Sequence, residues 1–359
     1  MNWDIVLGMA LGQGGLERVV ATVGRTLRRR GHGVRILQAG PSPYPWAQGL
    51  PLVHYDPLAG GGAPRYAGEP DVLRWAHGYR AICDTGGPPD VILATHTPFF
   101  SLIARLAAGI GPHAPVILSW IHGPPSAYGD LSPLRCADAH LAISRSVEDR
   151  LRAADRGEVG RPVFYVGNPV SLAVPPVGRP RAGAHFVFMG RISPEKRLDR
   201  LLEEIARVQA PWRLSIYGEG PLKEEMQALA ASLGIAHRVA WHGWRRDPFA
   251  ALADATALLL TSEYEGFGSA AAEALAHGVP VISSRSGGPE ELLRDGGGWL
   301  YPGHEAGALA AILEGIAAGR LPLPTQEECR RQVRSYAPGL VVDRIEAAAL
   351  SARAVAAMR

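Results

Sequence analysis

The sequence is poor in lysine and cysteine and has no long apolar run. Of its 359 residues, 37 are Lys or Arg, yet only two of these, Lys196 and Lys223, are lysines. The three cysteines show neither metal-ligand nor disulfide spacing, which favours a reducing compartment. No stretch approaches the roughly 18 apolar residues of a membrane-spanning helix. Asp4 interrupts the apolar stretch that a signal peptide would need. We therefore expect a cytoplasmic protein.

The rest of the composition is ordinary for a globular protein, with 47% hydrophobic and 20% charged residues. At about 150 residues per domain, the length predicts two domains. A proline-rich segment, 169–180, separates two similar halves. We expect an N-terminal lobe over residues 1–170, a linker at 171–184, a C-terminal lobe over 185–337, and a final helix at 338–359 that crosses back to the N-terminal lobe.

Short apolar runs alternate with helical patterns in both halves, which indicates α/β lobes with parallel sheets. Helices are expected at Leu16–Arg30 and Ser146–Ala154, and the Gly- and Pro-rich stretch 40–68 is predicted to be irregular. Two doubly wound, Rossmann-like lobes would place a ligand cleft at the carboxyl ends of their strands. The predicted strands are Asp4–Met9, Val34–Gln38, Val91–Thr95, Val116–Ile121, His140–Ser144, Val163–Val166, His185–Met189, Arg213–Tyr217, Val239–His242, Ala257–Thr261 and Val279–Ser283.

The net charge of +3 lies entirely in the first half of the chain. Residues 1–170 contain 16 arginines and 13 acids, whereas the remainder contains 21 basic and 21 acidic residues. This excess fits either solvated helix faces or a weak affinity for an anionic surface such as a membrane leaflet. Because aromatic residues are sparse among these arginines, we do not expect nucleic acid as a partner.

The first glycine cluster, residues 12–17, follows the first predicted strand and opens a helix. Gly14 and Gly15 offer backbone N–H groups to an anion at the helix N-terminus. The spacing does not match a dinucleotide fingerprint, because the position that would need the third glycine is Glu17. The sequence of this loop fits a tight structural turn and a phosphate-binding site equally well.

A second cluster, residues 190–197, follows the first strand of the C-terminal lobe. Pro194 suits the first turn of a helix, with Ser193 as its N-cap. Arg191 at the strand end and Lys196 in the first helical turn could converge on one diphosphate. In a chain with two lysines, a lysine at this position favours a binding role over a solvated helix start.

The third cluster, residues 262–275, is the most informative. Glu265 lies on a strand-to-helix turn, Gly266 and Gly268 expose backbone N–H groups, and Ser269 could cap the helix that carries Glu273. Two carboxylates eight residues apart across this turn can both face a ligand held over the helix N-terminus. Acids at such positions are suited to accept hydrogen bonds from sugar hydroxyls, but they would repel a bare phosphate. Helix-dipole stabilisation would explain Glu273 alone, but not the whole arrangement.

Two histidines follow predicted strands of the N-terminal lobe. His122 lies at the end of Val116–Ile121, where a ligand-facing role is favoured over a core histidine. His96 has a similar position, and both interpretations stay open for it.

Together these residues resemble the retaining glycosyltransferases of family 4, which have the two-lobed GT-B fold. Within that family the chain looks most like lipopolysaccharide-core galactosyltransferases, and the resemblance covers essentially the whole chain. The residues that carry it are the E-x7-E pair Glu265 and Glu273 with Gly266-Phe267-Gly268, Gly190-Arg191 with Glu195-Lys196, Gly14-Gly15 with Glu17, and Gly278 with Pro280-Val281.

The resemblance implies a role for each matching position. The catalytic set would be His122, Glu265, Arg191 and Lys196. Glu17 and His96 are candidates on the acceptor side. The donor site would be formed by Gly14, Gly15, Arg191, Lys196, Trp244, Arg245, Glu265, Gly266, Phe267, Gly268 and Glu273, with Arg191 and Lys196 on the diphosphate, Glu265 on the sugar, Glu273 on the ribose, and Trp244 and Arg245 near the base.

The implied reaction moves a hexose from a nucleoside-diphosphate sugar, with UDP as the nucleotide, to a saccharide or glycolipid acceptor such as lipopolysaccharide core. We expect transfer with retention, by front-face attack, without a metal and without a cofactor. The alternatives are a transferase with a small natural-product acceptor, a nucleotide-sugar epimerase, a phosphorylase-like enzyme and a non-catalytic sugar-binding protein. The enzyme would act in the cytoplasm, with weak peripheral contact to the inner face of an anionic membrane.

Overall fold

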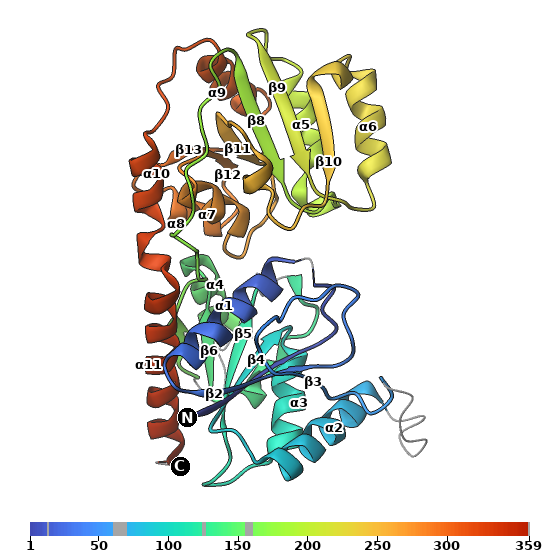
Figure 1. The fold of residues 1–359 in the computed structure, drawn as a ribbon, viewed down its shortest axis with the longest axis vertical. Coiled ribbons are helices and arrows are strands. Elements are labelled where there is room, and N and C mark those ends of the chain that lie inside the picture. The colour runs from blue at the N-terminus through green and yellow to red at the C-terminus, as the bar shows by residue number, and fades with distance from the viewer. Residues whose placement is uncertain (13, 60–69, 124–126, 155–160, 358–359) are drawn as a thin grey trace. The chain divides into compact units, whose positions relative to one another are not determined.

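The computed structural model describes residues 1–12, 14–59, 70–123, 127–154 and 161–357 (Figure 1). The chain divides into two compact units. The first comprises Met1–Pro169 together with Pro338–Arg359, and the second comprises Val170–Ala337.

The first unit has a seven-stranded parallel sheet in the order β3-β2-β1-β4-β5-β6-β7. Its strands are β1 (Asn2–Leu7), β2 (Gly33–Gln38), β3 (Leu52–His54), β4 (Val91–His96), β5 (Val116–Ile121), β6 (Ala139–Ala142) and β7 (Val163–Tyr165). Its helices are α1 (Gly15–Arg29), α2 (Asp71–Gly86), α3 (Phe99–Ala108), a 3-10 turn at Ser132–Cys136, α4 (Arg145–Ala154) and α11 (Pro338–Ala357).

The second unit has a six-stranded parallel sheet in the order β10-β9-β8-β11-β12-β13. Its strands are β8 (Ala184–Met189), β9 (Trp212–Tyr217), β10 (Val239–Gly243), β11 (Ala257–Leu260), β12 (Val281–Ser284) and β13 (Gly298–Tyr301). Its α-helices are α5 (Leu198–Ile205), α6 (Lys223–Ser232), α7 (Ser269–Ala276), α8 (Gly288–Leu292), α9 (Ala308–Ala317) and α10 (Gln326–Gln332).

The central strands are buried on both faces, which explains their nearly continuous apolar sequences. All six residues of β5 and all six of β8 are buried. In the first unit, α2 and α3 cover one face of the sheet with Tyr79, Phe100 and Ile103. In the second unit, α5 and α9 pack on the strand residues Phe186 and Ile216. The predicted pair of doubly wound α/β lobes is confirmed.

In each sheet the strand order reverses beside the first strand of the unit. The reversal lies between β1 and β4 in the first unit and between β8 and β11 in the second. Ligands of doubly wound sheets bind beyond the carboxyl ends of the strands at such a reversal. The loops that follow β1, β4 and β5, and those that follow β8, β11 and β12, are therefore where each unit is built to bind.

Two strands escape the sequence prediction. Strand β3 lies inside the stretch 40–68, which was expected to be irregular, and β13 follows Gly296 and Gly297. Both are short edge strands with residues that are only partly buried. A run of three or four residues without full burial has no distinctive periodicity, so its pairing depends on the neighbouring strand rather than on its own sequence.

The last helix, α11, belongs to the first unit although the whole second unit precedes it in the chain. It contacts α1, β5, β6 and β7. Arg30 at the end of α1 pairs with Asp343 and Glu346 of α11, and Arg344 donates to the backbone oxygen of Val166 at 2.8 Å.

The segment expected to be a linker, 171–184, lies within the second unit and pairs with other segments of it. Val177 donates its backbone N–H to His277 at 2.9 Å, and Gly178 forms a parallel bridge with Asp254. The prolines of this segment, on which the prediction of a linker rested, favour an extended strip. Part of the backbone of this strip is hydrogen-bonded to neighbouring segments of the same unit.

Arg179 fastens this strip through four backbone oxygens. Its two terminal nitrogens lie 3.0–3.4 Å from the oxygens of Ala255, Thr256, Gly278 and Pro324. Burial lowers the pKa of this guanidinium. Because one planar group joins the starts of two strands and a loop before α10, it ties together segments that lie far apart in the sequence.

We predict that Arg179→Ala destabilises the second unit by more than about 2 kcal/mol, because it leaves several partly buried carbonyl groups unpaired. Arg179→Lys should recover part of this loss, because one ammonium group cannot reach both pairs of oxygens. Urea unfolding monitored by tryptophan fluorescence measures the effect. The matched control is Arg181→Ala, which removes an exposed arginine two residues away. Equal unfolding midpoints for the variants at 179 and 181 would contradict this role.

Candidate functional site

In the second unit, the loop after β8 carries the predicted diphosphate residues. Pro194–Lys196 forms a single 3-10 turn, and α5 begins only at Leu198. Arg197 adopts a left-handed conformation with φ of 50°, which separates the two elements. The sequence predicts Lys196 in the first turn of an α-helix. In the structure it lies in the 3-10 turn that precedes α5. Ser193 precedes the turn, but its hydroxyl donates to the Glu195 carboxylate at 2.6 Å and does not cap the backbone.

Backbone hydrogen bonds from two neighbouring loops fix this turn. Ile192 donates to the backbone oxygen of Glu219 at 3.0 Å, and Glu263 donates to that of Glu195 at 2.9 Å. The Thr261 hydroxyl donates to the backbone oxygen of Lys196 at 2.9 Å. Gly220 is required for this approach, because a Cβ there would lie 2.1 Å from the Ile192 oxygen. The loops after β8, β9 and β11 thus form one connected group.

Arg197, which the sequence analysis passed over, stabilises the same group. Its guanidinium contacts both carboxylate oxygens of Asp199 at 2.8–3.2 Å and one oxygen of Glu263 at 2.9 Å. The hydrogen bonds that Arg197 donates to Asp199 raise the pKa of this guanidinium above its ordinary value. This arginine is committed to two neighbouring carboxylates, which distinguishes it from Arg191.

Lys196 and Glu265 lie in direct contact. Lys196 Nζ is 2.7 Å from Glu265 Oε1, and the two side chains are 23% and 13% exposed. The Ser262 hydroxyl donates to the same oxygen at 2.8 Å. Residues 69 positions apart in the sequence are therefore joined at the carboxyl edge of the sheet. The sequence predicts both as site residues, with Lys196 on the diphosphate and Glu265 on the sugar of the donor.

Arg191, in contrast, is exposed and forms no hydrogen bond or ion pair with any other residue that the structure describes. It directly follows Gly190 at the carboxyl end of β8. An unpaired guanidinium and a lysine with remaining N–H donors, five residues apart in one loop, give this edge a local positive charge suited to an anion.

The loop 262–268 is fixed by its backbone. Glu265 donates its N–H to Ser286 at 2.7 Å, and its carbonyl oxygen accepts from Gly288 at 3.0 Å. The Phe267 ring is buried and packs edge-on against Tyr336, with ring centroids 5.0 Å apart, so only its backbone can serve a ligand. Gly268, with φ of 83°, is the N-cap of α7, whereas the sequence had suggested Ser269.

The remaining residues of the predicted donor site in the second unit are Glu273, Trp244 and Arg245. Glu273 lies in α7 and is partly buried. Trp244 and Arg245 follow β10 at the sheet edge and are exposed. Burial raises the pKa of Tyr217, and Arg245 lies near enough to oppose this shift. The ring of Tyr217 stacks on His242 with centroids 4.5 Å apart, so an aromatic pair lies beside Arg245.

In the first unit, the glycine loop is organised around Glu17. Gly14 is the N-cap of α1, and Gly15 is its first residue. The Glu17 carboxylate is buried and accepts the backbone N–H of Gly12 at 2.9 Å. A Cβ at Gly14 would lie 2.4 Å from Glu17 Oε2, so a side chain at this position would displace the carboxylate.

The two predicted histidines lie close to this loop, at the ends of the neighbouring strands β4 and β5. Burial lowers the pKa of His96, and the nearby charge of Glu17 opposes the shift. Burial, assisted by His96, lowers the pKa of His122 to about 3, so this ring is neutral near pH 7. The structure therefore brings Glu17, His96 and His122 into one cluster.

This cluster contains unsatisfied polar atoms and backbone strain. The Nδ1 atom of His96 and the Nε2 atom of His122 are buried without a hydrogen-bond partner among the described residues. His96 also has a φ of 87°, a conformation that a residue with a side chain rarely adopts. Buried polar atoms without partners and residues with such φ values both concentrate at functional sites.

No group of three or more His, Cys, Asp or Glu side chains within the described ranges has the geometry of a metal site.

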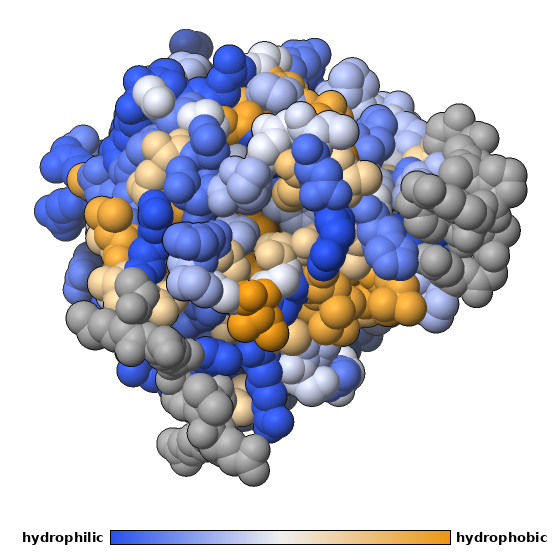
Figure 2. All heavy atoms as spheres, turned by 90° about the horizontal axis from the view of Figure 1, so that it is seen from below, coloured by the Kyte–Doolittle hydropathy of each residue, from blue (hydrophilic) through white to orange (hydrophobic). Residues whose placement is uncertain are grey.

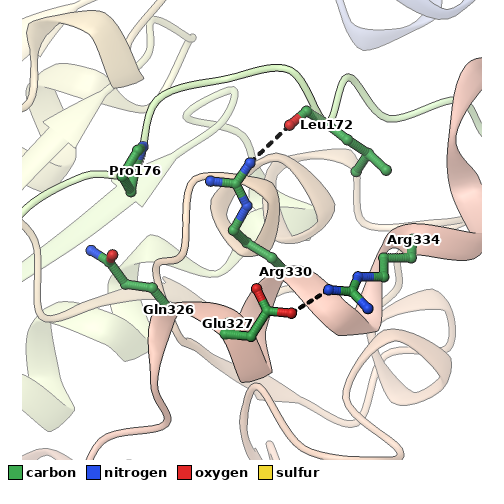
Figure 3. Close-up of a pocket in the computed structure, with 6 residues that line it drawn as sticks. All are labelled: Leu172, Pro176, Gln326, Glu327, Arg330 and Arg334. Atoms are coloured by element: carbon green, nitrogen blue, oxygen red, sulfur yellow. Dashed lines mark hydrogen bonds and ion pairs between the residues drawn. The ribbon is translucent and has the colours of Figure 1, made fainter.

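A hollow in the second unit lies between the strip 172–176 and α10. It has a volume of about 460 Å³ (Figure 3). Arg330 donates to the Leu172 oxygen at 2.9 Å, and Arg334 pairs with Glu327. None of the predicted site residues lines this hollow, and each of its two cations already has a partner.

Comparison with known proteins accounts for nearly the whole chain. Residues 13–174 match the family described as Glycosyltransferase Family 4. Residues 176–349 match the family described as Glycosyl transferases group 1.

Similar sequences include two lipopolysaccharide 1,6-galactosyltransferases. That of Salmonella typhimurium is 38% identical over 224 residues, which cover 59% of this chain and 61% of that protein. That of Escherichia coli is 29% identical over 276 residues, which cover 74% of this chain and 75% of that protein. The chain thus spans about three fifths of the length of the Salmonella relative and three quarters of the other.

Solved structures with the same fold cover the chain almost completely. The apo form of the lipopolysaccharide outer core galactosyltransferase WaaB matches 98% of this chain and 99% of its own, with a TM-score of 0.81 and 24% identity. HepE of Anabaena, in complex with UDP and glucose, matches 98% of this chain and 99% of its own, with a TM-score of 0.79 and 18% identity. The chain therefore belongs to the family 4 glycosyltransferases and has their two-lobed GT-B fold.

Proposed function

We propose that this protein transfers a hexose, in the first instance galactose, from a UDP-sugar to a saccharide of lipopolysaccharide core. The observation that carries the proposal is the contact between Lys196 and Glu265 at the carboxyl edge of the second unit, with the unpaired Arg191 in the same loop. One arrangement supplies cations for a diphosphate and a carboxylate for sugar hydroxyls, which are the two halves of a nucleotide sugar.

The geometry allows Lys196 to serve both halves at once. An ammonium group has three N–H donors, and one of them already points to Glu265. The remaining two can bind the diphosphate while the pair stays intact. When the bond between the sugar and the phosphate breaks, negative charge grows on the leaving diphosphate. Lys196 and Arg191 would stabilise that charge, which is the largest contribution that such a site can make.

The choice of sugar, nucleotide and acceptor rests on the relatives. Both galactosyltransferases named above act on lipopolysaccharide, and the Anabaena structure contains UDP and glucose. In the first unit we assign His122 to the donor sugar, and Glu17 and His96 to the acceptor. A histidine that stays neutral down to about pH 3 acts as a hydrogen-bond partner and not as a cation.

We further propose that transfer proceeds with retention and without a metal. After the diphosphate leaves, the sugar resembles an oxocarbenium ion, and the acceptor hydroxyl would attack on the face from which the diphosphate departed. A leaving phosphate oxygen would take the acceptor proton. In this scheme Arg191 and Lys196 supply the charge stabilisation that a metal supplies in other transferases.

A glycolipid acceptor would bring the first unit to a membrane surface, where we propose a weak electrostatic contact. Within the described residues no helix is both long and apolar enough to span a bilayer. Figure 2 shows small hydrophobic groups separated by hydrophilic side chains. Arg30, Arg35, Arg145 and Arg152 are paired with carboxylates. We take the exposed face of α1, which carries Arg25, Arg28 and Arg29, as the candidate surface. Salt-sensitive co-sedimentation with anionic but not neutral vesicles tests this contact.

The transfer itself is tested by incubating the protein with UDP-galactose or UDP-glucose and a lipopolysaccharide core acceptor that lacks the outer hexose. We expect an added mass of one hexose, UDP release, an α-linkage by NMR, and unchanged rates in the presence of a chelator. Epimerisation of the donor without any acceptor product would overturn the proposal, and so would binding of the nucleotide sugar without turnover.

We predict that Lys196→Ala lowers kcat by about 100- to 1,000-fold, because it removes a donor aimed at the charge that develops on the leaving group. Steady-state UDP release with saturating acceptor measures the effect. The melting temperature should change little, because Lys196 is partly exposed and its main-chain contacts remain.

The chain offers a matched control, since its only other lysine is Lys223. This residue forms a surface ion pair with Glu219, four residues before it in the loop that precedes α6, and such pairs contribute little to stability. Lys223→Ala should keep kcat within about twofold of the parent. A similar loss of activity in both lysine variants would remove Lys196 from the phosphate-binding role.

We also predict that Glu273→Gln weakens UDP binding by about 10- to 100-fold, because a carboxylate that accepts ribose hydroxyls forms stronger hydrogen bonds than an amide. Isothermal titration with UDP alone measures the dissociation constant. Glu203→Gln, an exposed position near the far end of α5, serves as the control. An unchanged dissociation constant in Glu273→Gln would exclude this residue from the ribose site.

A further inference from the structure

We infer that Ser262 is a positioning residue, which fixes the Glu265 carboxylate in the orientation that the donor sugar requires. The inference rests on the proposed function, because it gives Ser262 a task only if Glu265 contacts the sugar. Ser262 itself is 2% exposed, so its effect on the ligand would be indirect.

The two oxygens of Glu265 are used differently. Oε1 accepts two hydrogen bonds, from Lys196 Nζ at 2.7 Å and from Ser262 Oγ at 2.8 Å. Oε2 accepts none from the described part of the chain, while the side chain as a whole is 13% exposed. Two donors on one oxygen fix the rotation of the carboxylate, which leaves the second oxygen as the acceptor for a ligand hydroxyl.

Ser262 is well suited to hold this orientation because it is itself fixed. Its backbone oxygen accepts the hydroxyl of Ser284 at 2.7 Å, which joins the loop after β11 to the end of β12. Ser284 is also buried. Two successive hydrogen bonds, from Ser284 to Ser262 and from Ser262 to Glu265, therefore connect the sheet to the carboxylate. Neither of these hydrogen bonds requires a ligand.

The two donors to Oε1 differ in what they contribute: Lys196 supplies positive charge, and Ser262 fixes the orientation of the carboxylate. Lys196 is a flexible ammonium group that must also bind phosphate, so it alone would let the carboxylate follow its movements. The serine hydroxyl is short, neutral and buried, and it holds Oε1 at one place. We therefore assign affinity for the diphosphate to Lys196 and the alignment of the sugar acceptor to Ser262.

This division predicts a specific change when the hydroxyl is removed. Ser262→Ala should lower kcat/KM for the UDP-sugar by about 10- to 100-fold, which corresponds to the loss of one hydrogen bond to a charged group. The dissociation constant for UDP alone should stay within about twofold, because UDP lacks the sugar that Glu265 contacts. Ser262→Cys, which preserves the size but donates weakly, should behave like Ser262→Ala.

The deciding measurement is a double-mutant cycle with Glu265→Ala. If Ser262 acts through the carboxylate, Ser262→Ala should have no further effect once that carboxylate is gone. Ser283→Ala is the control for a lost buried hydroxyl, since Ser283 Oγ donates only to a backbone oxygen at 2.8 Å. It should change kcat/KM by less than about threefold.

The outcomes separate this inference from the proposed function. Parental kcat/KM in Ser262→Ala, additive losses in the cycle, or an equal loss of UDP affinity would each overturn the positioning role. If Glu265→Ala itself transferred sugar at the parental rate, the assignment of Glu265 to the donor sugar would fail as well. A loss in Ser262→Ala and Ser262→Cys that disappears in the Glu265→Ala background supports the inference.

Discussion

Parallel pairing of strands is the constraint on which the rest of this structure depends. A strand can pair in parallel with its neighbour only if the chain returns across a face of the sheet, so all the carboxyl ends of one sheet lie along one edge. Residues that are distant in the sequence, such as Lys196 and Glu265, meet at that edge because they follow β8 and β11, which are adjacent in the sheet. Glu17, His96 and His122 are gathered in the same way after β1, β4 and β5.

At the carboxyl edge of the second unit, hydrogen bonds between neighbouring loops fix the positions of the side chains that meet there. In the second unit, Thr261, Ser262 and Ser284 hold the two loops through hydroxyl contacts of 2.7–2.9 Å. Arg197 pairs with Asp199 and Glu263, and Lys196 pairs with Glu265. Arg191 is exposed, with no ion-pair partner in the described part of the chain. The site therefore combines a rigid backbone with few free charges, which is the condition under which electrostatic stabilisation is strong.

The sequence was sufficient to predict the fold class, most of the strands and some of the residues that meet at each edge, such as Lys196 and Glu265. Apolar runs and glycine loops report directly on buried strands and on helix starts. The short edge strands β3 and β13 were missed because they have no distinctive periodicity. The left-handed Arg197 was missed because a single residue with positive φ leaves no signal in the sequence. The roles of Ser262 and Arg179 depend on partners about 3 Å away in space, and serine and arginine are too common for spacing to reveal such contacts.

The place of α11 has a consequence for how the protein is made. The first unit is interrupted in the sequence, because its last helix is translated only after the whole of Val170–Ala337. During synthesis the second unit is therefore complete before the first has received the helix that contacts α1, β5, β6 and β7. Until then, apolar surface of the nascent first unit stays exposed to water. The first unit, which begins the chain, therefore receives its last packing element only when synthesis of the second unit has ended.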